Sequence, residues 1–243
     1  MFKQISPIFR REFFAYFNTG LGSIMLAVYL LLSMFAAFYL GNFFEVGNFD
    51  LFSFFYFQPY IFLIVTPALT MRLWAEERKS GSIEFILTQP VSLTAVVFAK
   101  FLAAWSFAFV MLLSTVPFWI YMNAEFALDN MNILCAYAAC ILMAGMFCAA
   151  GCMISSFNSS PVTAYILTLF IIWGVIGVNF SPLIRLLPAD GSVLSGIMQA
   201  LNFDKHFQDM VSGQVSMDNL IYYFSAVFLS LWLNVVSIEY KKG

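Results

Sequence analysis

The longest unbroken run of charged side chains in the sequence lies about a third of the way along the chain. It reads Glu-Glu-Arg-Lys and is followed by Ser-Gly-Ser and a further Glu. Acid before base at helical spacing stabilises a helix through local ion pairs, and a glycine can end or cap that helix. The pattern indicates a short charged helix that docks onto a partner, and the alternative is a solvated loop whose charges only set topology. The residues of this candidate docking element are Glu76, Glu77, Arg78, Lys79, Gly81 and Glu84.

The remaining residues that could do chemistry are four cysteines and one histidine. Cys148 and Cys152 are four residues apart and would share a helix face, which could bind a soft metal, but glycine and alanine surround them. Small residues at this spacing favour close helix packing. His206 cannot form a zinc site alone, and we expect an ordinary polar residue of a loop. The sequence therefore predicts no metal site, no catalytic residue and no enzyme activity in this chain.

The composition indicates a membrane protein. Of 243 residues, 62% are hydrophobic and only 10% are charged, whereas ordinary globular chains are about 25% charged. The formal net charge of -2 gives no support to nucleic-acid binding.

A membrane-spanning helix needs about 20 mostly apolar residues, and the sequence offers six such stretches. We therefore expect an all-α membrane protein with six transmembrane helices in a single domain, 1–243. The first stretch is too long for a typical signal peptide and is expected to be a retained anchor. Prolines in the second are expected to kink it. The stretches run from Leu21 to Leu40, Phe52 to Trp74, Phe98 to Met122, Asn132 to Ser155, Val162 to Val178, and Asn219 to Val236.

The positions of lysine and arginine orient these spans, because such residues accumulate in cytoplasmic connections. With six crossings, only Arg185 and Lys205 would lie outside the cytoplasm. Both termini are therefore expected to be cytoplasmic. The cations on the cytoplasmic side would be Lys3, Arg10, Arg11, Arg72, Arg78, Lys79, Lys100, Lys241 and Lys242.

Three segments outside the spans have distinct patterns. Phenylalanines at helical spacing with interspersed charges predict an N-terminal cytoplasmic interfacial helix over 1–18, rather than the frayed start of the first span. Residues 75–97 form the cytoplasmic connection that carries the charged run. Residues 179–218 combine turn signals with a helical repeat and suggest a re-entrant or interfacial extracytoplasmic segment. The expected interfacial side chains are Lys3, Arg10, Arg11 and Phe13.

Two absences bear on the energy source. No Asp, Glu, Lys, Arg or His lies near the centre of a predicted span, although such groups usually mark proton or ion pathways. The sequence also lacks the G-x-x-x-x-G-K-[ST] phosphate loop. If the protein moves cargo against a gradient, ATP must be hydrolysed on another polypeptide.

Two motifs resemble those of ABC-2 type permeases. The stretch from Ala75 to Ser92 is similar to the family pattern E-x-(K/R)-x-G-(S/T)-x-E-x-L-L-(T/S)-x-P, which is followed by G-K. Here Ile86 replaces the first Leu, and Ala99 replaces the Gly before Lys100. The stretch from Phe203 to Phe224 resembles a loop found in the branch that contains gliding-motility and copper-enzyme-maturation permeases. The resemblance covers nearly the whole chain.

The resemblance implies a permease subunit of an ATP-driven exporter that forms the translocation pathway in the bacterial cytoplasmic (inner) membrane. Its implied partners are cytoplasmic ABC ATPase subunits, which carry ATP and magnesium, and a second permease subunit in a homodimer or related heterodimer. Extracytoplasmic accessory proteins are a further class of partner. The N-terminal helix and the element from Glu76 to Glu84 would receive the motion of the ATPase. The alternatives are a membrane scaffold that recruits a cytoplasmic partner, and an ion-coupled carrier. The sequence does not identify the cargo.

Overall fold

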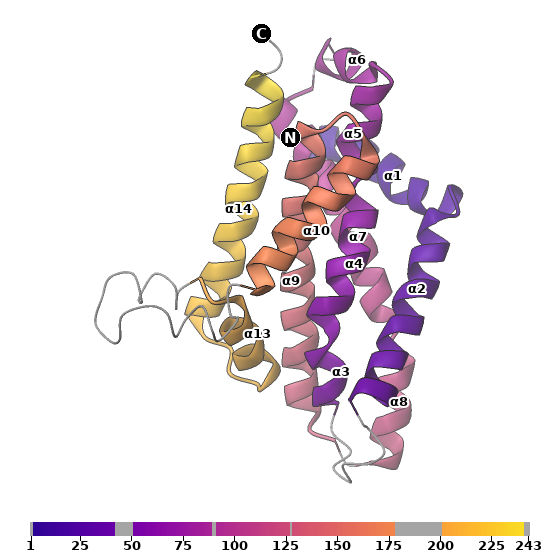
Figure 1. Cartoon of the computed structure of the whole chain (residues 1–243), viewed down its shortest axis with the longest axis vertical. Coiled ribbons are helices and arrows are strands. Elements are labelled where there is room, and N and C mark those ends of the chain that lie inside the picture. The colour runs from indigo at the N-terminus through magenta and orange to yellow at the C-terminus, as the bar shows by residue number, and fades with distance from the viewer. Residues whose placement is uncertain (1, 42–50, 89–90, 127, 178–200, 241–243) are drawn as a thin grey trace, which may run out of the picture.

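The chain folds into one elongated helical bundle (Figure 1). The computed structural model describes residues 2–41, 51–88, 91–126, 128–177 and 201–240, and every regular element in these ranges is a helix. The helices are α1 (Phe2–Asn18), α2 (Leu21–Phe35), which continues as a π-helix (Ala36–Leu40), α3 (Phe52–Tyr56), α4 (Gln58–Thr70), α5 (Arg72–Lys79), α6 (Ser82–Thr88), α7 (Leu93–Leu113), α8 (Val116–Glu125), α9 (Asn130–Phe157), α10 (Pro161–Gly177), α13 (Phe203–Val211) and α14 (Met217–Tyr240).

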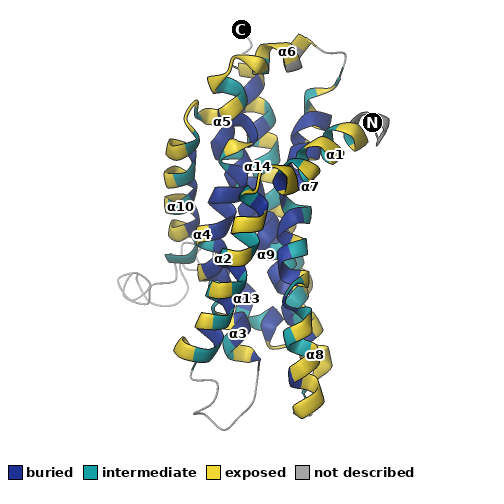
Figure 2. Cartoon of the chain, turned by 90° about the vertical axis from the view of Figure 1, so that its right-hand side faces the viewer, coloured by how far each residue is buried: buried dark blue, intermediate teal, exposed yellow. Residues whose placement is uncertain are grey.

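The central helix of the bundle is α9, which packs against α14, α4, α7 and α10. Its small residues allow these close contacts. A Cβ atom added at Gly145 would lie 3.0 Å from Trp105 Nε1, and one added at Gly151 would collide with Thr70 Oγ1. The close packing predicted for the cysteine-bearing span is confirmed at these positions. The dark-blue interior in Figure 2 shows that the buried residues follow this central helix and its neighbours.

Four helical stretches are long and apolar enough to cross a membrane, among the residues described. They are Leu21–Leu40, Leu93–Glu125, Asn130–Phe157 and Met217–Tyr240. They correspond to the predicted first, third, fourth and sixth spans. The predicted fifth span is the shorter apolar helix α10, of 17 residues. The all-helical, membrane-embedded class is thus confirmed, and the count of six crossings stays a prediction.

The predicted second span is divided into α3, α4 and α5. The breaks fall at Phe57 and Met71, and α4 runs through Pro67. Because proline has no N–H and its ring crowds the carbonyl four residues earlier, it weakens the helix around it. The hydrogen bond from the amide of Met71 to the carbonyl oxygen of Pro67 is nevertheless present, at 2.9 Å.

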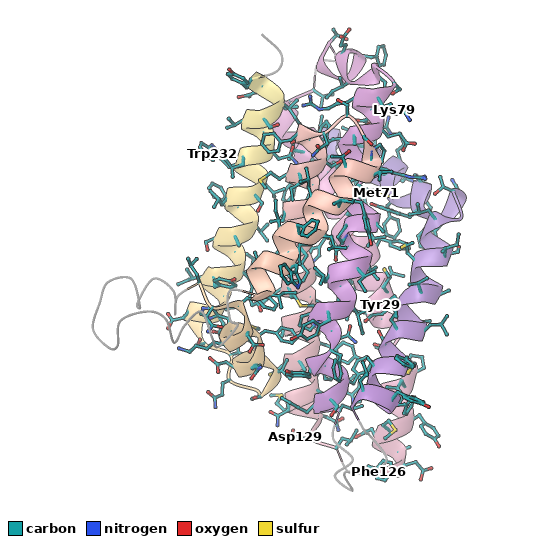
Figure 3. All side chains as sticks on the ribbon, viewed as in Figure 1. Tyr29, Met71, Lys79, Phe126, Asp129 and Trp232 are labelled. Atoms are coloured by element: carbon teal, nitrogen blue, oxygen red, sulfur yellow. The ribbon has the colours of Figure 1, made fainter. Side chains whose placement is uncertain are left out.

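Basic side chains cluster at the end of the bundle that carries α1, α5 and α6, which we call the basic end. Figures 1 and 2 place this end at the top, with the C-terminal end of α14 beside it. Figure 3 shows Lys79 there and Asp129 at the opposite end, near Phe126. The described cations at the basic end are Arg10, Arg11, Arg72, Arg78, Lys79 and Lys100.

A glycine with a positive φ separates α1 from α2. Gly20 has a φ of 68°, which side-chain-bearing residues rarely adopt. The sequence predicts a helix over 1–18 that is separate from the span beginning at Leu21, and the structure has both α1 and the break after it. The location of α1 at a membrane interface stays a prediction.

The predicted extracytoplasmic segment 179–218 falls largely outside the described residues, which resume at 201. Its described part contains α13. The expectation for His206 was wrong. It lies in α13 rather than in a loop, is only 8% exposed, and its Nδ1 is 2.7 Å from Asn219 Oδ1.

Candidate functional site

A buried lysine in the first turns of α7 is the centre of the candidate site. The side chain of Lys100 is 1% exposed, and its ammonium has three hydrogen-bond acceptors. Nζ donates to Glu77 Oε1 at 2.7 Å, to the carbonyl oxygen of Leu73 at 2.7 Å and to Glu12 Oε1 at 3.2 Å. It also lies 5.0 Å from the ring centroid of Trp74, within range of a cation–π contact. Every N–H of the ammonium is therefore satisfied.

The lysine joins three helices through two carboxylates. Glu12 belongs to α1 and Glu77 to α5, and both side chains are 16% exposed. Arg11 completes the group, with Nη2 at 2.7 Å from Glu12 Oε1 and 3.6 Å from Glu77 Oε1. Two cations and two carboxylates balance in formal charge. We call these four residues, Arg11, Glu12, Glu77 and Lys100, the ion cluster.

The two carboxylates respond differently to the same surroundings. Burial opposes the ionised form of Glu12, but Lys100 and Arg11 outweigh it and hold the pKa of Glu12 below its ordinary value. Burial prevails at Glu77 over the attraction of Lys100, and Glu12 adds repulsion, so the pKa of Glu77 is raised. Two carboxylates that share one buried ammonium titrate as a unit. Lys100 holds the cluster together because its ammonium donates to both carboxylates.

Aromatic contacts fix the helix that supplies Glu12. Tyr16 is one turn further along α1, and its ring stacks on Phe107 of α7 with centroids 4.8 Å apart. Its hydroxyl donates to the carbonyl oxygen of Leu69 in α4 at 2.8 Å. Since residues four apart share a helix face, the same face of α1 presents Glu12 to Lys100 and Tyr16 to Phe107.

A cavity of about 250 Å³ opens between α1 and α5 beside the ion cluster. Its lining mixes charged and hydroxyl-bearing side chains with apolar ones. The lining residues are Glu12, Ala15, Tyr16, Thr19, Leu21, Leu69, Arg72, Leu73, Glu76, Glu77, Ser80, Ser82 and Lys100.

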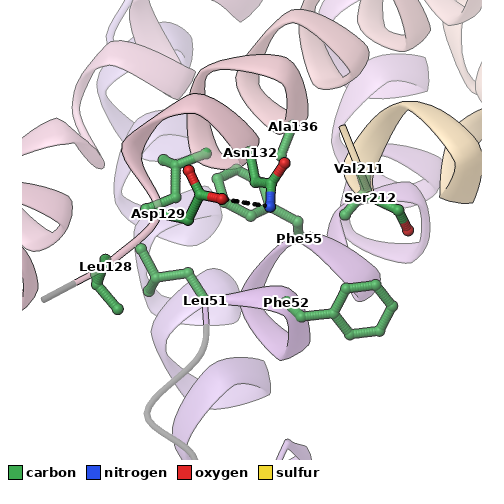
Figure 4. Close-up of a pocket in the computed structure, with 10 residues that line it drawn as sticks. Leu51, Phe52, Phe55, Leu128, Asp129, Asn132, Ala136, Val211 and Ser212 are labelled. Atoms are coloured by element: carbon green, nitrogen blue, oxygen red, sulfur yellow. Dashed lines mark hydrogen bonds between the residues drawn. The ribbon is translucent and has the colours of Figure 1, made fainter. Parts of the chain in front are cut away.

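A second cavity, of about 430 Å³, lies at the opposite end between α3, α9 and α13 (Figure 4). Its carboxylate already has structural partners: Asp129 caps α9 by accepting from the amide of Met131 at 3.1 Å, and it accepts from Asn132 Nδ2 at 2.9 Å. The rest of the lining is mainly apolar, so this cavity offers no reactive group.

The structure places the six residues of the predicted docking element in three different surroundings. Glu76, Lys79, Gly81 and Glu84 are exposed at the basic end. Glu77 points inward to Lys100 and so belongs to an internal link. Arg78 is partly buried, and its Nε and Nη2 have no hydrogen-bond partner within the described chain.

A turn at Gly81 sets the direction of α6. Gly81 has a φ of 73°, and α6 begins at the next residue. Phe85 of α6 is 69% exposed, which is unusual for a phenylalanine outside the apolar part of the bundle. α6 ends at Thr88, two residues ahead of Pro90 in the sequence.

The expected interfacial residues lie along α1. Arg10 is exposed, and its guanidinium lies 5.8 Å from the ring centroid of Phe14. Arg11 is part of the ion cluster. Phe13 packs against the core and stacks on Phe9. Lys3 lies in α1, and its side chain falls outside the described residues.

The sequence reasoning missed the ion cluster itself. The sequence patterns give Lys100 a role only in the orientation of the spans and in the family motif, and they indicate no role for Glu12 or Trp74. A signal was present, because a lysine followed by a long apolar run must find an anion when its helix packs. The identity of that anion depends on how distant helices meet, which the sequence does not show.

The comparison with known families agrees with this architecture. Residues 45–238 match the family described as ABC-2 family transporter protein. No curated protein matches the chain significantly. The match covers well over half of the sequence, and the chain therefore belongs to the ABC-2 transporter family. It is a membrane permease component of an ABC transporter.

Proposed function

We propose that this chain is the transmembrane subunit of an ATP-driven exporter, and that separate ATPase subunits dock on its basic end. The observation that carries the proposal is the ion cluster, which connects α5 to α1 and to the long helix α7. A docked subunit that moves α5 would thereby move elements that reach into the membrane. In this scheme the chain has no catalytic residues or cofactor of its own, and ATP and magnesium bind to the partner.

The charge distribution supports a cytoplasmic location for the basic end. Lysine and arginine in short connections stay on the cytoplasmic side, and the described cations other than Lys205 lie at the basic end. We therefore place both termini in the cytoplasm of a bacterium, with six crossings of the inner membrane. The dimeric state, with a second identical or related permease, follows from the family resemblance and is part of the proposal.

The burial of ionisable groups supports an external energy source. Within the described chain, the buried side chains of the Asp, Glu, Lys, Arg and His types are Lys100 and His206, which lie toward opposite ends of the bundle. Ion-coupled carriers usually keep such groups at membrane depth. A partner that contacts two conformations differently can shift their populations without any ion relay.

The proposed docking surface consists of the exposed side chains Glu76, Lys79, Glu84 and Phe85. An exposed aromatic ring next to charges of both signs has the composition of an interface anchor with a polar rim. Arg78 lies partly buried beside this surface, and its positive charge adds to the basic character of the end.

The proposal is tested by measuring binding of the cognate ATPase to the chain in nanodiscs. Replacing Glu84 by Lys should weaken binding about tenfold or more and abolish the stimulation of ATP hydrolysis. The matched control is Glu125→Lys, which reverses an exposed acidic residue at the opposite end, in α8. Full binding by Glu84→Lys, or equal loss by Glu125→Lys, would refute docking at α5 and α6.

A further inference from the structure

The junction between α4 and α5 is the point where a membrane-embedded helix meets the proposed docking helix. α4 ends at Thr70, α5 begins at Arg72, and Met71 stands between them (Figure 3). A helix interrupted in this way has backbone groups that need partners from elsewhere. At this junction the partners are side chains of three other helices.

Ser155 of α9 makes three hydrogen bonds to the backbone at this junction. Its hydroxyl donates to the carbonyl oxygen of Met71 at 3.0 Å and accepts from the amides of Trp74 at 3.1 Å and Ala75 at 3.2 Å. A continuous helix would direct those two amides to Thr70 and Met71. A serine hydroxyl has one donor and two acceptor sites, so this side chain uses its full capacity on the junction. Ser155 is completely buried, which excludes water as a substitute.

Two carbonyls that flank Met71 are held by different helices. The carbonyl oxygen of Leu69 accepts from the hydroxyl of Tyr16 in α1, and that of Leu73 accepts from Lys100 Nζ in α7. The carbonyls at 69, 71 and 73 thus have partners on α1, α9 and α7 respectively. Of these contacts, only the one from Ser155 bridges the interruption, because it bonds to Met71 on one side and to α5 on the other.

Close approach of the helices makes this bridge possible. Gly151 lies one turn before Ser155 on α9, and a side chain there would collide with Thr70 Oγ1. The absence of a side chain brings the α9 backbone close enough for a short serine to reach the backbone of α5.

We infer that Ser155 is a positioning residue that fixes α5 to α9, so that the docking helix and the central helix move as one body. The inference rests on the proposed function for the source of the motion, and the hydrogen bonds themselves are independent of it. A displacement of α5 by a docked subunit is then transmitted to the centre of the bundle rather than absorbed by bending at Met71.

The test measures the distance between spin labels at Ser80, the exposed residue that caps α5 and is not part of the proposed docking surface, and Phe157, the last residue of α9, by pulsed electron paramagnetic resonance. The labels are attached to a genetically encoded residue, so that the native cysteines remain. The chain is reconstituted in nanodiscs alone, with its cognate ATPase, and with the ATPase trapped by ATP and vanadate. The expected result is one narrow distance distribution that is the same in all three states.

The Ser155→Ala variant should broaden the distribution, and in the complex its mean should shift between the nucleotide-free and trapped states. Ser156→Ala is the matched control, because Ser156 is equally buried but donates only to Met153 of its own helix. Ser155→Thr retains the hydroxyl and should restore the narrow distribution. It also keeps the test decisive should Ser155→Ala not fold.

Two results would overturn the inference. One is a distribution for Ser155→Ala that equals that of the unmodified chain, and the other is a distance in the unmodified chain that shifts with nucleotide. If no ATPase binds, the proposed function fails, but the comparison of Ser155→Ala with Ser156→Ala in the chain alone still decides whether Ser155 fixes α5 to α9.

Discussion

Replacing Lys100 by Met should destabilise the protein, yet the same replacement should stabilise a variant that lacks both carboxylates of the ion cluster. In the unmodified chain, Lys100 and Arg11 together balance the charges of Glu12 and Glu77, and the side chain of Lys100 is 1% exposed. In the Glu12→Gln, Glu77→Gln background, the ammonium is buried without an anion. The sign of the effect therefore depends on the background.

The expected magnitudes follow from the burial. Removing one partner of a buried ion pair costs about 3–5 kcal/mol, so Lys100→Met alone should lower the free energy of unfolding by about that much. Because that cost comes from a buried charge without a partner, replacing the uncompensated lysine by an apolar residue of similar length should recover about the same amount, about 3–5 kcal/mol. The contact with the Trp74 ring, worth about 0.5–2 kcal/mol, is too small to replace two carboxylates.

The assay is unfolding by sodium dodecyl sulfate in mixed micelles, followed by tryptophan fluorescence, for the unmodified chain and the variants. The four proteins are the unmodified chain, Lys100→Met, the double glutamine variant, and the triple variant. An equal loss of stability on Lys100→Met in both backgrounds would show that the lysine contributes packing rather than charge neutralisation, and the reasoning about the ion cluster would be wrong.

Three further experiments test other parts of the structure. Gly81→Val should cost about 1–2 kcal/mol because a β-branched residue resists positive φ and should reduce ATPase binding, while Gly81→Asn, which tolerates that conformation, should bind normally. Gly151→Ala should cost about 1–3 kcal/mol by overpacking in the unfolding assay above, whereas Gly174→Ala, which has open space around it, should be neutral; equal effects would contradict the close approach of α4 and α9. A maleimide should label Cys135 in the folded protein and leave the buried Cys148 unreacted until it unfolds, as mass spectrometry of the labelled chain would show; labelling at Cys148 would refute its burial.

Local signals in the sequence predicted much of the helical framework. Apolar length located α2, α9 and α14, and the glycine at 81 marked the turn between α5 and α6. These features depend on residues close to one another in the chain. The prolines of the predicted second span indicated that it bends, and its breaks lie at Phe57, two residues before Pro59, and at Met71, four residues after Pro67. The hydrogen bonds of Ser155 at Met71 could not be predicted in the same way, because they join helices that are distant in the sequence.

The candidate site was predicted only in part for the same reason. The charged run predicted which segment is exposed at the basic end, but not that Glu77 turns inward while Glu76 and Glu84 face outward. That choice depends on Lys100, which is 23 residues away in the sequence. Tertiary contacts, rather than local pattern, decide which members of a charged run form internal ion pairs.

Photo-crosslinking shows whether the ATPase docks on the surface formed by α5 and α6. A benzophenone amino acid is placed at Phe85, which is 69% exposed, and in a separate variant at Tyr121 of α8, which is 64% exposed at the opposite end. We expect a crosslink to the ATPase subunit from position 85 and none from position 121. Absence of a crosslink at 85 in a complex that hydrolyses ATP, or an equal yield at 121, would contradict it.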